Sequence, residues 1–209
     1  MYTLYGTRGS GSAAIEAALE LAGLPYRNVR ASTWEDDSAQ AELRALNPLG
    51  QIPTLQTPGG AVLTESAAIL ITLGLDHPES GLLPAAPAAR AQAVRGLVYI
   101  AANCYSAISI GDYPERWCNE PDADTNARIR AGARQRLHHH WELFADQFAA
   151  EPFLGGGQPG ALDLLAAVVS RWSGTRAHLQ AQRPAFAATL MRVQTHPRLA
   201  AVFERHWPE

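Results

Sequence analysis

The chain has 209 residues, of which 20 are acidic and 17 are basic, and its formal net charge is −3. It contains no dense basic cluster of the kind that binds a nucleic-acid backbone. Its two cysteines, Cys104 and Cys118, are too few for a disulfide framework and too far apart for a CxxC motif. We therefore exclude nucleic-acid-binding proteins and disulfide scaffolds.

The sequence enters a strand pattern at once, without the charged and apolar regions of a secretory signal, and its apolar runs fall short of a membrane span. We expect a cytoplasmic protein that binds neither membrane nor nucleic acid. At this length about 70% of the unfolded chain's surface can be buried, so stability requires no metal.

The first 78 residues mix strand and helix signals. Strands are predicted at residues 2–5, 26–30, 53–57 and 61–64, and helices at roughly 11–22, 35–46 and 65–76. Gly23 ends the first helix, and Gly59-Gly60 turns the last two strands into a hairpin. The order β-α-β-α-β-β-α is that of a small α/β domain.

A proline-rich stretch, residues 77–89, separates this region from a part of the chain with no clear strand pattern. Helices are predicted there at about 88–118, 122–150, 161–177, 184–194 and 197–206. We therefore predict an α/β domain over residues 1–78, a linker over 79–87 and an all-α domain over 88–209.

The turn before the first helix contains Gly9-x-Gly11-x-x-Ala14, which matches a dinucleotide-binding fingerprint. The free N–H groups and positive dipole end of that helix attract either a pyrophosphate or a thiolate. The preceding strand is short and polar, whereas a nucleotide-binding parallel strand is continuously apolar. A nucleotide-binding oxidoreductase, which would bind NAD or NADP, is the weaker hypothesis.

The segment NPLGQIPTL, residues 47–55, places Pro53 directly before a predicted strand. A cis Ile52–Pro53 bond would turn the chain so that the N–H and C=O groups of Ile52 face outward and pair with a ligand's backbone. A trans proline that opens an ordinary strand is the more common arrangement.

After the hairpin, LTESAAIL places Glu65 and Ser66 at the first positions of a helix. These residues and the helix N-terminus can hold an amino-acid head group, with its carboxylate on the dipole and its ammonium on Glu65. The alternative is that Thr64-Glu65-Ser66 only caps the helix. Together the two segments describe a site for a small peptide.

With these two motifs at this spacing, the chain resembles a cytosolic glutathione S-transferase of bacterial type. The resemblance implies a thioredoxin-like domain followed by a helical bundle, a homodimer, glutathione as co-substrate and a small hydrophobic electrophile as second substrate. It also implies a cis-Pro53. It places Ile52 on the cysteinyl backbone of glutathione, Glu65 and Ser66 on the γ-glutamyl group, and Gln51 beside them.

The resemblance also implies that the turn holds the glutathione sulfur. Ser10 falls where theta- and delta-like members carry a catalytic serine, and Gly11 falls on the cysteine of beta-like members. Leu4 matches the catalytic tyrosine of alpha-, mu- and pi-like members, and strand alternation points Tyr5 to the other face. Ser12, at the helix start, is a second catalytic candidate. Both serines can instead be turn and cap residues.

In the helical domain, Tyr105 falls where beta-like members carry a functional histidine, so we expect it to line the second-substrate pocket. Tyr99 and Asn103 precede it at spacings that let only some of the three share a face. The segment GALDLLAAV resembles the family's buried capping box, with Asp163 at the helix start and Gly160 in place of a serine or threonine.

We expect no metal, because the consecutive residues His138, His139 and His140 point about 100° apart on a helix and cannot converge on one ion. The sequence thus predicts a glutathione transferase that transfers the glutathione thiolate to small electrophiles. The alternative is a non-catalytic binding or assembly module of the same fold.

Overall fold

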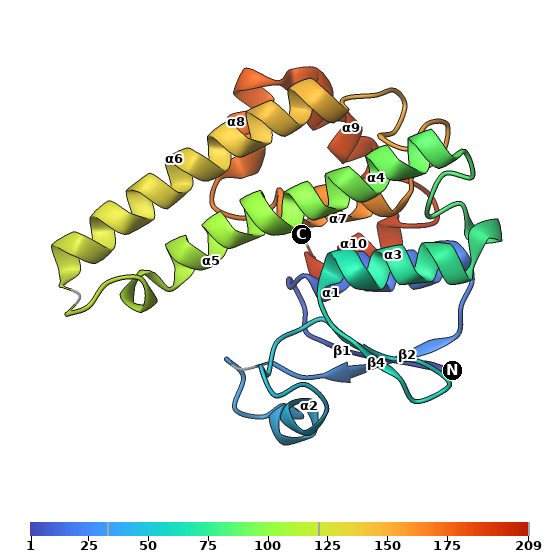
Figure 1. Cartoon of the computed structure of the whole chain (residues 1–209), viewed down its shortest axis with the longest axis horizontal. Helices are drawn as coiled ribbons and strands as arrows, with labels where there is room; N and C mark the ends of the chain where they lie inside the picture. Colours follow the sequence, from blue (N-terminus) through green and yellow to red (C-terminus); the bar gives the residue numbers. More distant parts are fainter. Residues whose placement is uncertain (33, 121, 209) are drawn as a thin grey trace.

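The computed structural model describes residues 1–32, 34–120 and 122–208. Its four strands are β1 (Tyr2–Gly6), β2 (Tyr26–Arg30), β3 (Thr54–Gln56) and β4 (Val62–Leu63). They form one sheet in the order β2-β1-β3-β4, in which β1 runs parallel to β2 and antiparallel to β3. Helices α1 (Ser12–Ala22) and α3 (Ser66–Asp76) lie between this sheet and the helical region, and α2 (Gln40–Leu46) lies on the opposite face (Figure 1).

This mixed sheet is thioredoxin-like and confirms the predicted α/β class. It is not the parallel, doubly wound sheet of a dinucleotide-binding domain, so the Gly9-x-Gly11 pattern is a coincidence of the turn. Strand alternation acts as expected in β1, where Leu4 packs in the main core and Tyr5 faces α2. Tyr5 Oη donates a hydrogen bond to Glu42 at 2.6 Å, and burial together with that bond raises the pKa of Tyr5 to about 12.

The rest of the described chain is helical. Its elements are η1 (Pro78–Ser80), α4 (Pro87–Tyr99), the π-helical segment η2 (Ile100–Tyr105), α5 (Ser106–Asp112), η3 (Pro114–Arg116), α6 (Ala123–Phe148), α7 (Ala161–Val169), α8 (Thr175–Gln182), α9 (Pro184–Gln194) and α10 (Ala200–His206). The all-α character predicted for this region is confirmed. The predicted linker, residues 79–87, begins within η1 and ends at the first residue of α4.

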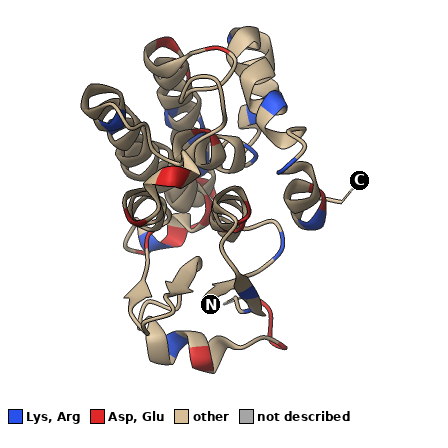
Figure 2. Ribbon diagram, turned by 90° about the vertical axis from the view of Figure 1, so that its right-hand side faces the viewer, with Lys and Arg blue, Asp and Glu red and all other residues tan. Residues whose placement is uncertain are grey.

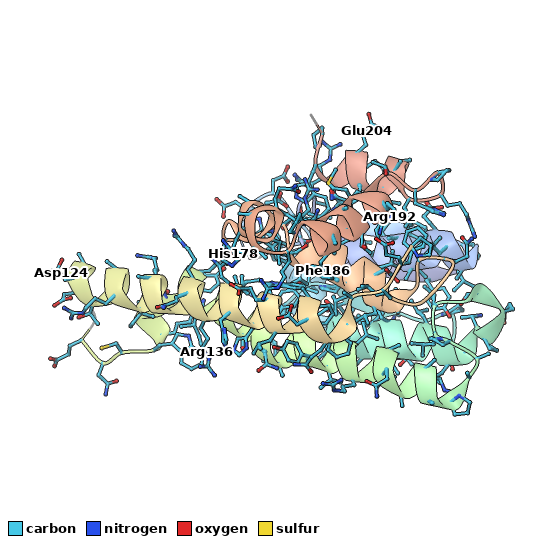
Figure 3. All side chains as sticks on the ribbon, turned by 90° about the horizontal axis from the view of Figure 1, so that it is seen from above. Asp124, Arg136, His178, Phe186, Arg192 and Glu204 are labelled. Carbon is cyan, nitrogen blue, oxygen red and sulfur yellow. The ribbon has the colours of Figure 1, made fainter. Side chains whose placement is uncertain are left out.

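The core of this region forms around α7, every residue of which is buried. Phe186 of α9, labelled in Figure 3, belongs to this core. Its ring packs against Trp141 and Phe144 of α6, with ring centroids 6.3 and 5.8 Å apart. Arginine and acidic residues are interspersed along both parts of the chain, as the blue and red segments of the ribbon in Figure 2 show.

Most predicted helix ends agree with the structure to within three residues, but two ends differ by more. The helix expected over 35–46 begins at Gln40, because Ser38 Oγ donates to the Ser32 and Glu35 carbonyls and holds the preceding residues in a turn. The helix expected over 88–118 runs through α4, η2 and α5 and ends at Asp112, because the residue before Pro114 is disfavoured in a helix.

The helix expected over 161–177 is two helices, α7 and α8. Ser173 and Gly174 between them have left-handed backbone, with φ of 56° and 76°. Since a continuous α-helix cannot include such residues, the chain turns there.

The continuous helical stretch Pro87–Asp112 is long and apolar enough to cross a membrane by length and composition. The sequence-based expectation that every apolar run falls short of a membrane span was therefore wrong for this stretch. Its alanine-rich sequence has few charges. Leu97, Ile100 and Cys104 in this stretch are fully buried in the protein core. This packing is that of a core helix. A core helix can be as long and as apolar as a membrane-spanning one.

The start of α7 is capped by Asp163. Its Oδ1 accepts the Leu154 N–H at 2.7 Å, and its Oδ2 accepts the N–H groups of Gly160 and Gly155 at 2.9 and 3.2 Å. Burial raises the pKa of Asp163 to about 6, although these hydrogen bonds oppose the rise. A Cβ atom on Gly160 would lie 2.9 Å from the Leu82 carbonyl oxygen. The linker therefore passes too close to this position for a residue with a side chain.

We therefore predict that Gly160→Ser destabilises the protein by roughly 1–3 kcal/mol, although serine is the better N-cap residue in isolation. Urea unfolding measures the change. The matched control is Gly157→Ser in the same loop, where an added Cβ meets no atom within 4 Å. Equal stability of the two variants would contradict the steric explanation.

Candidate functional site

The turn from Thr7 to Ser12 joins β1 to α1 and is held together by its two serines. Ser10 Oγ lies 2.8 Å from the Thr7 carbonyl oxygen, to which it donates, and 2.8 Å from Ser12 Oγ. Ser12 Oγ also donates to the Thr7 carbonyl, at 3.2 Å, and the Ser12 N–H donates to Ser10 Oγ at 3.2 Å. Both side chains are buried. The two predicted catalytic hydroxyls are thus hydrogen-bonded inside the turn.

The Ile52–Pro53 bond is cis, as the resemblance implied. Pro53 is buried, Ile52 is half-buried and Gln51 is exposed. Asn47 and Thr54 donate hydrogen bonds to the Gln51 carbonyl at 3.1 and 2.8 Å. Across the described ranges, neither main-chain group of Ile52 has a hydrogen-bond partner. The N–H and C=O groups of Ile52 therefore form a short open backbone edge, which is available to pair with a ligand.

Helix α3 begins beside this edge. Glu65, its N-cap residue, is exposed and has φ of 62°, and no side chain caps the helix. A non-glycine residue in this backbone region costs on the order of 1–3 kcal/mol and occurs often at functional sites. Ser66 follows as the first helical residue and is half-buried. The helix start thus leaves N–H groups available to an anionic ligand.

Tyr105, at the end of η2, reaches from the helical domain to these elements. Its hydroxyl occupies the place that a Cβ on Gly11 would take, and Pro53 Cδ lies 3.6 Å from the same point. Burial raises the pKa of Tyr105, and the neighbouring Ser66 hydroxyl lowers it only in part. The structure therefore brings Gly11, Pro53, Ser66 and Tyr105 together at one point.

Two tryptophans that sequence reasoning missed stand next to this point. The Trp172 ring lies 5.7 Å from the Tyr105 ring, and Trp207 Nε1 lies 3.6 Å from the position of a Cβ on Gly9. The Arg171 guanidinium stacks over the Trp207 ring at 4.3 Å. No local motif marks these residues, because they reach the turn from distant parts of the chain.

Tyr99 and Asn103 face elsewhere. Tyr99 Oη donates to the His140 carbonyl at 3.1 Å, and Asn103 Nδ2 donates to the Tyr99 carbonyl at 3.1 Å. Of the three polar residues considered in this helix, the structure brings Tyr105 to the site. His138 stacks on His178 at 4.2 Å, and within residues 1–32, 34–120 and 122–208 no group of three His, Cys, Asp or Glu side chains could hold a metal.

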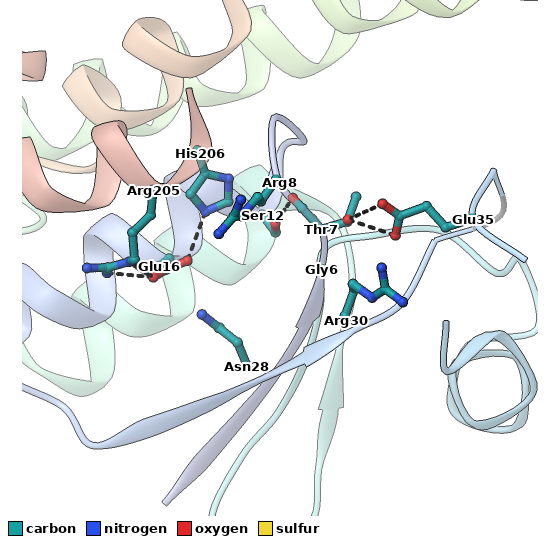
Figure 4. A pocket seen from close by; sticks show the side chains of 10 residues that line it. All are labelled: Gly6, Thr7, Arg8, Ser12, Glu16, Asn28, Arg30, Glu35, Arg205 and His206. Carbon is teal, nitrogen blue, oxygen red and sulfur yellow. Dashed lines mark hydrogen bonds and ion pairs between the residues drawn. The ribbon is translucent and has the colours of Figure 1, made fainter. Parts of the chain in front are cut away.

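A separate cavity of about 470 Å³ lies beside the turn, between β2, α1 and α10. It is lined by Gly6, Thr7, Arg8, Ser12, Glu16, Asn28, Arg30, Glu35, Arg205 and His206 (Figure 4). None of the residues expected to bind glutathione through the hairpin lines it. The cavity shares only the turn with that site.

A buried carboxylate in this cavity joins the first domain to the last helix. Glu16 of α1 lies 2.8 Å from His206 Nε2 and 2.6 Å from Arg205 Nη2, as the dashed lines in Figure 4 show. Burial alone would raise the pKa of Glu16, but the hydrogen bonds from His206 and Arg205 outweigh it and hold the pKa at about 2. Glu16 is therefore ionised at neutral pH.

Residues 12–74 match the family model described as glutathione S-transferase, N-terminal domain. Over 207 residues, 99% of this chain and 98% of the relative, the sequence is 32% identical to an uncharacterized GST-like protein, YncG, of Escherichia coli K12. The chain belongs to the glutathione S-transferase family.

Other members of the family match over shorter or more distant alignments. A maleylacetoacetate isomerase of Rhizobium meliloti is 39% identical over 171 residues, which cover 75% of this chain and 74% of that protein. A crystal structure of a glutathione transferase homologue from Sulfitobacter, with bound glutathione, superposes with a TM-score of 0.85 at 25% identity, covering 97% of this chain and 96% of that one. These comparisons confirm the predicted family, fold and glutathione transferase function at the level of the family.

The Glu16 cluster predicts how this family member responds to acid. A carboxyl whose pKa falls from 4.5 to about 2 on folding contributes stability above pH 4.5 that is lost as the pH drops through 2. We expect the free energy of unfolding to fall by up to about 3 kcal/mol between pH 5 and pH 2 through this residue. Glu16→Gln should remove that part of the pH dependence and lower stability at pH 7.

Chemical denaturation of both proteins across this pH range measures the effect. The control is Glu20→Gln, since the Glu20 side chain is 42% exposed and lies 3.5 Å from Arg205. Identical pH dependence in the wild type and Glu16→Gln would show that the cluster does not stabilise the fold as an ion pair.

Proposed function

We propose that this chain is an active glutathione transferase in which glutathione lies across the turn, the Ile52–Pro53 segment and the start of α3. The observation that carries the proposal is the convergence of Gly11, Pro53 and Ser66 around the Tyr105 hydroxyl. The same elements provide the N-termini of α1 and α3 and the unpaired backbone of Ile52. Each of these three features suits one part of a γ-glutamyl peptide.

The peptide is bound mainly through backbone and charge. The N–H and C=O groups of Ile52 pair with the cysteinyl residue as an added strand does, next to Gln51 and Pro53. The γ-glutamyl carboxylate lies on the N–H groups at the start of α3, and Glu65 pairs with its ammonium group.

The reaction needs glutathione as a thiolate. A cysteine-type thiol has a pKa of about 8.5, so lowering it by ~2 units requires about 2.7 kcal/mol of preference for the charged form. A hydroxyl that donates a hydrogen bond to an anion contributes about 1.5–3 kcal/mol, and a helix N-terminus ~0.3–1. One hydroxyl beside the start of α1 is sufficient, and Ser10, Ser12 and Tyr105 are the candidates.

The thiol proton leaves to solvent, and a sulfur lone pair forms the new C–S bond. The electrophile gives up a leaving group with its electron pair; when the thiolate instead adds to a double bond, the π electrons move to the far carbon, which takes a proton from solvent. The aromatic side chains of Tyr105, Trp172 and Trp207 beside the turn suit a small hydrophobic electrophile. A first panel of substrates comprises an aryl halide, an epoxide and an α,β-unsaturated carbonyl compound.

We also propose a cytoplasmic homodimer. Leu75 of α3 and Val98 of α4 are 55% and 52% exposed, although both are large apolar side chains on packed helices. Both cysteines are free, which suits a reducing compartment. Light scattering on the purified protein determines the oligomeric state, and a monomer would contradict the dimer without affecting the proposed chemistry.

We predict that Glu65→Ala and Ser66→Ala each weaken glutathione binding tenfold or more, about 1.4 kcal/mol, because each removes a partner of a charged group. Isothermal titration calorimetry measures the affinity. Glu79→Ala, which removes another exposed glutamate near α3, is the control and should bind normally.

Unchanged affinity in both site variants would refute the site assignment. Normal binding of glutathione without a lowered thiol pKa or any turnover would favour the non-catalytic binding module instead.

A further inference from the structure

We propose that the Tyr105 hydroxyl, and not a serine of the turn, donates the hydrogen bond that stabilises the glutathione thiolate. This inference rests on the proposed function and names the catalytic hydroxyl of the same site. Three observations support it: the position of the Tyr105 hydroxyl, the hydrogen bonds of the two serines, and the backbone of the helix that carries Tyr105.

The position of the hydroxyl comes first. It lies where a side chain on Gly11 would begin, at the first turn of α1, and Tyr105 Cζ lies 3.4 Å from that same point. Pro53, at the open backbone edge, is 3.6 Å from it. A peptide paired with Ile52 would have its cysteinyl side chain near Pro53 and the start of α1. The phenol hydroxyl is therefore within reach of the sulfur.

The serine hydroxyls are engaged in the turn. Ser10 and Ser12 both donate to the Thr7 carbonyl, and Ser10 Oγ accepts the Ser12 N–H. Turning either hydroxyl toward a ligand would break a buried hydrogen bond, which costs about 1–3 kcal/mol. The Ser10 and Ser12 hydroxyls therefore hold the turn together and are poorly placed to donate a hydrogen bond to a thiolate.

The helix carrying Tyr105 is locally π-helical over Ile100–Tyr105, a conformation found frequently at functional sites. The π-helical segment ends at Tyr105, whose ring packs against Trp172, while the preceding residue, Cys104, is fully buried in the core. The phenol is therefore held by its neighbours before any ligand binds.

The protonation state of the phenol agrees with a donor role. Because burial raises the pKa of Tyr105, the hydroxyl keeps its proton throughout the neutral range. Ser66 can donate to the phenol oxygen, which leaves the phenol hydrogen available to the sulfur. Tyr105 would act by hydrogen bonding and would not remove the thiol proton as a base.

The test compares Tyr105→Phe with Tyr99→Phe, Ser10→Ala and Ser12→Ala. The readouts are the thiolate absorbance of enzyme-bound glutathione across pH and the separate kcat and KM values with an aryl halide. Tyr105→Phe should raise the pKa of bound glutathione by about one unit or more and lower kcat about tenfold near neutral pH. The KM for glutathione should change less than about twofold, because the peptide backbone is held elsewhere.

The other three variants should leave the bound pKa nearly unchanged. Tyr99 is the matched control, since its hydroxyl bonds the His140 carbonyl away from the turn. An unshifted titration curve for Tyr105→Phe would overturn the proposal, and a shift confined to Ser10→Ala or Ser12→Ala would give the role to that serine. If wild-type protein binds no glutathione, the proposed function fails and the inference falls with it.

A second variant leaves the tyrosine in place. In Gly11→Ala the new Cβ collides with the phenol hydroxyl and displaces it, so the bound pKa should rise as in Tyr105→Phe. The double variant Gly11→Ala/Tyr105→Phe should show no further rise, because both changes remove one interaction. Additive rises would show that Gly11 affects the thiolate by another route.

Discussion

The buried carboxylate of Glu16 holds α1 against α10, so the helix that begins at the turn after β1 is fixed to the last helix. An ionised group in such a place is stable only with close partners, and His206 and Arg205 supply them. Because α1 cannot shift without breaking this pair, the turn at its start keeps its position relative to the helical domain. The geometry around Gly11 depends on that constraint.

At the starts of two helices, a glycine leaves room for a group from another part of the chain. At α1, Gly11 leaves room for the Tyr105 hydroxyl, and at α7, Gly160 leaves room for the Leu82 carbonyl. In both places a residue that caps helices well by local rules would collide with a group from elsewhere in the chain. The first arrangement lies at the proposed ligand site, and the second brings the linker against the start of α7.

The proposed site combines backbone groups, suited to hold a peptide, with a hydroxyl from the helical domain, which we propose donates to the sulfur. Ile52 and the start of α3 suit the parts of glutathione that do not react, and the turn lies where the sulfur would be. Tyr105, Trp172 and Trp207 come from the helical domain, whereas the proposed peptide-binding elements belong to the first domain.

Local patterns in the sequence were enough to predict the strands and helices of the first domain, because turns, caps and periodicity depend on nearby residues. The family and the cis Ile52–Pro53 bond followed from the resemblance that two of these motifs carry. The helix predicted from Glu65 begins one residue later, at Ser66, and the helix predicted over 161–177 is two helices. Local patterns could not decide which hydroxyl faces the ligand. That depends on the hydrogen bonds inside the turn, on the π-helical segment before Tyr105 and on contacts from Trp172 and Trp207. Such contacts join residues far apart in the chain, so only the tertiary structure determines them.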